Sequence, residues 1–177
     1  ISGDRIVCRR AIANEFNTQF ANMAKMLNDE AYADKPLKEY KKFNDFLPAP
    51  SKSSIFLEDT SEDEVEATIR GLESGKSSDI PILLVKASSN IIARPLTNLY
   101  NKCIRNGVFP TVFKTSRITP IHKKGSTEDF GNYRPVSTIP IFGKIFEKLL
   151  YTRLHSFFAA NDVISDSQFG FRQNHST

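Results

Sequence analysis

The chain has 177 residues, 40% of them apolar, which is enough for one ordinary domain or one lobe of a larger protein and argues against disorder throughout. Its net charge of +4 comes from 24 basic and 20 acidic residues, a mild excess that by itself indicates no particular partner. The two cysteines, Cys8 and Cys103, and the three histidines lack the spacing of a disulfide framework or a zinc site. We therefore expect a reduced, intracellular protein of the nucleus or cytoplasm without a metal site. No apolar run approaches the roughly 20 residues that span a bilayer, so we expect no membrane contact.

The first part of the chain predicts a helix, a loop and a short strand. From Ile12 to Leu27 apolar residues recur every three or four positions, as in an amphipathic helix. Residues 28–52 contain three prolines among Lys, Asp and Ser, which is typical of a long loop, with aromatic residues as its anchors. The run Ser54–Leu57 that follows predicts a short strand.

Start and stop signals indicate two further helices. Ser61 and Glu64 match a capping box, and the apolar positions after them predict a helix that stops at Gly75. Asp79 followed by Pro81 suits the start of another helix, because an acidic cap and a proline in the first turn both favour helix initiation.

The next helix is predicted to start at Asn90 and to end at Gly107. Its apolar face consists of Ile92, Leu96, Leu99 and Cys103. Pro95 lies early in this stretch, so either a kinked helix or a later start fits the sequence.

Beyond Pro110 the pattern changes from helix to strand and back. Arg117–His122 and Tyr133–Ile139 predict the two strands of a β-hairpin, with glycines in the polar link between them and a basic tip. From near Pro140 a wide apolar stripe predicts a helix of roughly 16–20 residues.

Basic residues gather on the expected hairpin. The acids concentrate in Glu58–Glu73, whereas residues 114–124 hold four basic residues and no acid. Lysine offers phosphate a compact charge and arginine a planar fork, so the candidate nucleotide-binding residues are Arg117, Lys123, Lys124 and Arg134. The competing interpretation is a charged hairpin tip that is simply solvated.

The last ten residues form the second candidate site. Gly170 lets the backbone turn or approach a ligand closely, Phe171 can pack or stack on a base, and Arg172 can reach a phosphate. Together with Gln168 they are candidate nucleic-acid-binding residues. A buried Phe-Gly-Phe joint with Arg172 as a structural clamp is the alternative, and for Phe169 the core is the expected place.

The motifs occur in a fixed order: IANEFN, GKSSDIP, TPIHKKG (Thr119–Gly125), NYRPVS (Asn132–Ser137), IFGKIFEKLL and QFGFRQNHST (Gln168–Thr177). From about Ile12 to Thr177 this series resembles the reverse transcriptase of non-LTR, jockey-type retrotransposons. One departure is local: the loop at SSDIP is shorter than in many relatives.

The resemblance implies an α+β protein, mostly helical, in which residues 1–110 form an N-terminal helical extension. Residues 111–177 would form the fingers of a right-hand polymerase, with the β-hairpin, truncated before the palm. By this similarity Lys123, Lys124 and Arg134 fall on the hairpin that contacts the triphosphate, and Gln168 to Arg172 on the part that lines the template and primer channel.

The implied partners are an RNA template, a DNA primer, dNTP and the palm and thumb of the same polypeptide, with priming on nicked chromosomal DNA. In the intact enzyme two Mg²⁺ ions are held by palm aspartates, which lie beyond the second motif. The chain ends at Thr177 inside that motif, so we expect a fragment that has no catalytic residue or cofactor of its own and is inactive alone. The alternative is a non-catalytic nucleic-acid-binding or scaffolding remnant of such an element.

Overall fold

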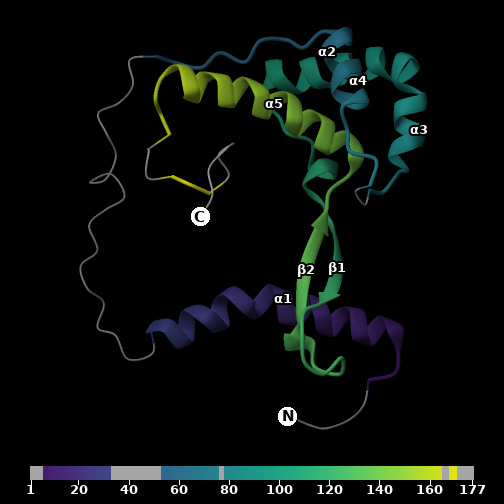
Figure 1. Cartoon of the computed structure of the whole chain (residues 1–177), viewed down its shortest axis with the longest axis vertical. Helices are drawn as coiled ribbons and strands as arrows, with labels where there is room; N and C mark the ends of the chain where they lie inside the picture. The colour runs from purple at the N-terminus through teal and green to yellow at the C-terminus, as the bar shows by residue number, and fades with distance from the viewer. Residues whose placement is uncertain (1–5, 33–52, 76–77, 165–167, 171–177) are drawn as a thin grey trace. The chain divides into compact units, whose positions relative to one another are not determined.

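The computed structural model describes residues 6–32, 53–75, 78–164 and 168–170 (Figure 1). The elements in chain order are α1 (Arg9–Tyr32), α2 (Glu62–Arg70), α3 (Ile82–Ala87), α4 (Ser89–Asn106), η2 (Thr111–Lys114), β1 (Arg117–His122), η3 (Phe130–Asn132), β2 (Tyr133–Thr138) and α5 (Ile141–Ala160). The chain divides into two compact units, one of residues 1–48 with 118–137 and one of residues 49–117 with 138–177. The expected boundary at residue 110 between an extension and the fingers stays a prediction.

The larger unit is a small helical core in which α2, α4 and α5 pack together (Figure 1). Tyr100 of α4 lies at its centre with no exposed surface, and its ring stacks on Phe146 of α5 at 4.9 Å. Its hydroxyl donates a hydrogen bond to the Phe142 carbonyl at 2.8 Å, so the one polar group of this buried side chain is satisfied. Burial raises the pKa of Tyr100, as expected for a phenol removed from water.

Side chains, and not a neighbouring strand, hold the segment that precedes α2. Asn101 accepts a hydrogen bond from the Thr60 amide at 2.7 Å and donates one to the Thr60 carbonyl at 2.9 Å. Arg153 of α5 donates to the carbonyls of Glu58 and Asp59. The strand expected at Ser54–Leu57 is therefore wrong, because nothing in the described part of the chain pairs with that segment as a ladder.

The capping box is confirmed. The Glu64 amide donates to the Ser61 hydroxyl at 3.1 Å, and α2 begins at Glu62. The predicted stop at Gly75 is wrong by one turn, since α2 ends at Arg70 and Gly71 forms its C-cap.

Asp79 caps a different helix from the one expected. Its carboxylate accepts a hydrogen bond at 2.8 Å from the amide of Ile141, the first residue of α5. At the start of α3, Pro81 is the N-cap and offers no side-chain bond. The amide at the start of α5 thus obtains its acceptor from a residue 62 positions earlier, which also ties the two helix starts together.

The α4 helix starts at Ser89, so Asn90 lies inside it and is not its cap, contrary to expectation. Pro95 lies within the helix, which rules out the later start. The predicted end is confirmed: Gly107 has φ +61°, its amide bonds to the Ile104 carbonyl at 3.1 Å, and Val108 bonds back to Cys103 at 3.0 Å. This is a Schellman termination, which favours glycine.

Two other helix predictions hold. The expected amphipathic helix is α1, which continues to Tyr32 and so includes the first five residues of the predicted loop at 28–52. Residues 33–52 lie outside the described residues. The predicted helix from Pro140 is α5, with 20 residues. The described fold is thus mostly helical with one two-stranded antiparallel hairpin, in agreement with the expected α+β class. No helix in the described ranges has the length and apolar character needed to cross a membrane.

Candidate nucleic-acid interface

The candidate interface is the hairpin of β1 and β2, whose register follows from its hydrogen bonds. The Lys123 amide donates to the Asn132 carbonyl at 2.8 Å, so these two residues lie opposite each other at the end of the ladder. Counting back two by two places Arg134 opposite Ile121 and Arg117 opposite Thr138. Because side chains alternate between the faces of a strand, Arg117, Lys123 and Arg134 share one face, which we call the arginine face.

The two prolines of the hairpin fit the same register. Pro120 lies opposite Pro135, in a pair whose amides do not take part in the ladder. The missing N–H groups are therefore not needed between the strands. The backbone nitrogens of both prolines face the outer edges of the ribbon, where the lack of an N–H group blocks pairing with a further strand.

The N-terminal helix covers the face opposite the arginines. Tyr133 and His122 lie on that face, with their rings 5.3 Å apart. Phe16 of α1 meets Tyr133 edge-on at 4.9 Å and Phe130 at 4.7 Å. Edge-to-face contacts of this kind stabilise the packing by about 0.5–1.5 kcal/mol beyond the effect of the buried area. Because α1 packs on the opposite face, it leaves the arginine face free to meet a ligand.

The four candidate cations Arg117, Lys123, Lys124 and Arg134 are all exposed. Within the described ranges none of them forms a salt bridge, whereas Arg70, Arg105 and Arg153 of the helical core each pair with an acid. Between the arginines the face carries Ile121 and Val136, each 47% exposed. The arrangement offers unpaired positive charge beside an aliphatic surface.

The connection between the strands, residues 123–132, also carries acids. Asp129 accepts a hydrogen bond from the Gly131 amide at 2.8 Å and so caps η3, while Glu128 is exposed. The Tyr133 hydroxyl donates to the Thr127 carbonyl at 2.9 Å, and His122 Nε2 lies 3.1 Å from the Gly125 carbonyl. The tip is therefore an ordered turn of mixed charge whose lysines lie at its β1 end.

The second candidate site is described only in part. The Gln168 amide donates to the Gly170 carbonyl at 2.9 Å, which closes a local turn. Phe169 is 51% exposed, so its expected place in the core is wrong. Phe171 and Arg172 lie outside the described residues, and their roles stay predictions.

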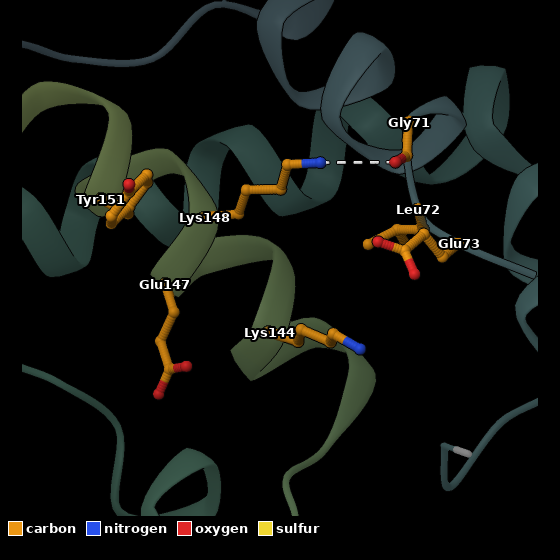
Figure 2. A pocket seen from close by; sticks show the side chains of 7 residues that line it. All are labelled: Gly71, Leu72, Glu73, Lys144, Glu147, Lys148 and Tyr151. Atoms are coloured by element: carbon orange, nitrogen blue, oxygen red, sulfur yellow. Dashed lines mark hydrogen bonds between the residues drawn. The ribbon is translucent and has the colours of Figure 1, made fainter. Parts of the chain in front are cut away.

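The helical core has an open pocket of about 330 Å³ where the end of α2 meets the side of α5 (Figure 2). Its lining consists of Gly71, Leu72, Glu73, Lys144, Glu147, Lys148 and Tyr151. Lys148 donates to the Gly71 carbonyl at 3.3 Å. Two lysines and two glutamates leave the pocket without net charge, so it lacks the field that would attract a polyanion.

The described residues contain no group of three or more His, Cys, Asp or Glu side chains that could hold a metal ion.

The known proteins to which this chain is similar include three from Drosophila melanogaster, although no protein-family profile matches the chain. The probable RNA-directed DNA polymerase from transposon BS is 31% identical over 143 residues, which are 78% of this chain and 16% of that protein. The RNA-directed DNA polymerase from mobile element jockey is 31% identical over 137 residues, 75% of this chain and 15% of that protein. The probable RNA-directed DNA polymerase from transposon X-element is 37% identical over 83 residues, 46% of this chain and 9% of that protein.

The chain thus spans only 16% and 15% of the length of the first two relatives. The aligned segments nevertheless include 78% and 75% of the residues of this chain. Over most of its length the chain is therefore related in sequence to a segment of the RNA-directed DNA polymerases of non-LTR retrotransposons, the group that its ordered motifs indicate.

Proposed function

We propose that this chain is the fingers region, with its N-terminal extension, of an RNA-directed DNA polymerase, and that its hairpin contacts the triphosphate of the incoming dNTP. The similarity to the transposon BS and jockey polymerases supports the enzyme class. The observation that carries the contact is the arginine face, where exposed cations lie without acidic partners among the described residues.

The spacing along the hairpin determines which cations can contact the same phosphate group. Arg134 lies opposite Ile121, two positions from Lys123, so both can reach one triphosphate. Arg117 is four positions further along the strand, about 13 Å at 3.3 Å per residue. It therefore contacts a different phosphate, that of the template or primer backbone.

In the intact polymerase the hairpin cations neutralise the charge that develops on the phosphates during nucleotidyl transfer. The magnesium ions for this reaction belong to carboxylates outside the described residues. The alternative of a non-catalytic RNA-binding remnant uses the same cations, but the polymerase relatives do not favour it.

Binding of single-stranded RNA to this chain is expected to fall steeply with salt, because lysines and arginines that contact phosphates displace counterions. Replacement of Lys123 and Lys124 together by alanine should lower the slope of log K against log salt by about 1.4, at roughly 0.7 per contact. Fluorescence anisotropy at several salt concentrations measures both quantities.

The matched control is Lys25→Ala with Lys102→Ala, since both lysines are exposed and the net charge changes equally. If the slope of log K against log salt falls as much in the control as in the hairpin variant, the salt dependence reflects net charge and not contacts made by the hairpin lysines. A slope near zero in the parent chain would rule out phosphate contacts altogether.

A further inference from the structure

In the ten-residue connection of the hairpin, the side chain of Asn132 ties the lysine-bearing end to the return end. Asn132 lies directly before β2 and is half-buried. Its side-chain amide donates to the Ser126 carbonyl at 3.0 Å. Four other side-chain contacts among the described residues support the connection. Tyr133 donates to the Thr127 carbonyl, Asp129 accepts from the Gly131 amide, Ser126 accepts from the Glu128 amide, and His122 Nε2 lies against the Gly125 carbonyl.

The backbone of Asn132 completes the tie. Its carbonyl accepts the Lys123 amide at 2.8 Å, and its own amide donates to the Asp129 carbonyl at 3.1 Å. Three bonds from one residue thus fix the chain on both sides of Lys124. Loops of this length are otherwise free to sample many conformations, and ordering them on binding costs affinity.

Gly125 packs closely against the side-chain amide of Asn132. Its φ is +80°, a conformation that favours glycine, and a Cβ atom there would lie 2.6 Å from Asn132 Nδ2. The close approach follows directly after the two lysines, so the position of the Asn132 amide and the path of the lysine segment depend on each other.

We infer that Asn132 is a positioning residue that holds the Lys123–Lys124 segment in the geometry in which both ammonium groups meet the triphosphate. The inference rests on the proposed triphosphate contact and adds a residue that acts through the lysines. Without the tie the lysines keep their charge but must be ordered again by each nucleotide that binds.

The test is single-turnover dNTP incorporation by the intact polymerase that contains this chain. Asn132→Ala removes the amide donor without adding a charge beside the lysines. We expect the apparent Kd for dNTP to rise about threefold to tenfold with a smaller change in the maximal rate. Hydrogen–deuterium exchange of residues 123–132 should speed up, while the melting temperature stays the same.

Gly125→Ala should give the same two effects, because it displaces the Asn132 amide without changing it. Asn106→Ala is the matched control, since Asn106 donates a comparable side-chain bond to the Lys102 carbonyl on α4. In a background with Lys123→Ala and Lys124→Ala, Asn132→Ala should cause no further loss, because residues that act through one another are not additive.

The results for the positioning role of Asn132 and for the triphosphate contact can be told apart. A full additional loss in the lysine-free background, or an unchanged Kd for dNTP in Asn132→Ala, overturns the positioning role. If the lysine substitutions themselves leave dNTP binding unchanged, the proposed triphosphate contact fails, and that result is separate from the effect of Asn132.

Discussion

Replacement of Arg134 by alanine in the intact polymerase is expected to lower nucleotide incorporation by a factor of about 10²–10³, the size seen when one preorganised charge-stabilising donor is removed. Arg134 is exposed on the arginine face and forms no salt bridge with any described residue, so its guanidinium can grip two phosphate oxygens. Lysine at the same position should restore only part of the rate, because the planar fork is lost.

Arg94→Ala is the control for this experiment, since Arg94 is also an exposed arginine, on α4, with a side chain that is 78% exposed. Single-turnover incorporation and the melting temperature should be measured for both variants. If Arg134→Ala retains normal stability and normal incorporation, Arg134 has no contact with the nucleotide. A melting temperature that drops together with the rate identifies Arg134 as a structural clamp.

The second large effect concerns the stability of the helical core. Arg153→Ala is expected to lower the free energy of unfolding by about 2–3 kcal/mol, below the 3–5 kcal/mol of a fully buried pair because water reaches Glu64. The Arg153 side chain is 17% exposed and donates to both Glu64 carboxylate oxygens, at 2.7 and 2.8 Å. Its loss also leaves the Glu58 and Asp59 carbonyls without these donors.

Arg105→Ala supplies the comparison, because Arg105 pairs with Asp59 at the same end of α2 while its side chain is 69% exposed. Urea unfolding should show a clearly smaller loss for Arg105 than for Arg153, since exposed ion pairs contribute little. Equal losses would show that the Glu64 pair is not the element that holds α5 to α2.

The same pair makes stability depend on pH. The hydrogen bond from Arg153 is the largest cause that holds the pKa of Glu64 below its ordinary value of 4.5. A carboxyl group whose folded pKa is depressed adds stability above its unfolded pKa and loses it as the pH falls through the folded value. The difference in stability between the parent chain and Arg153→Ala should therefore be full near neutral pH and shrink below about pH 4.5.

Features with local causes could be predicted from the sequence. The capping bond between Ser61 and Glu64 spans three residues, and the Gly107 termination depends on one left-handed glycine. The hairpin can be predicted because its strand alternation and its turn residues lie close together in the chain. The end of α2 shows the limit of such signals: Gly71 ends the helix, whereas the sequence pattern predicts the stop at the later glycine, Gly75.

Features with distant causes could not be predicted in this way. Asp79 looks like a local cap, but its acceptor oxygen serves Ile141, 62 residues away. The segment before α2 looks like a strand, but side chains of α4 and α5 hold it. For the candidate site, residue types identified the cations, whereas their shared face and the role of Asn132 depend on the register of the ladder.

Photochemical labelling with a dNTP that carries an aryl azide on its γ-phosphate is the most direct test of the hairpin's contact with the triphosphate. The intact polymerase is labelled with template and primer present, digested and examined by mass spectrometry. We expect the label on the peptide that contains Lys123, Lys124 and Arg134, and we expect unlabelled dNTP to compete it away. Competable label found only on peptides outside residues 117–138 would contradict the proposed contact.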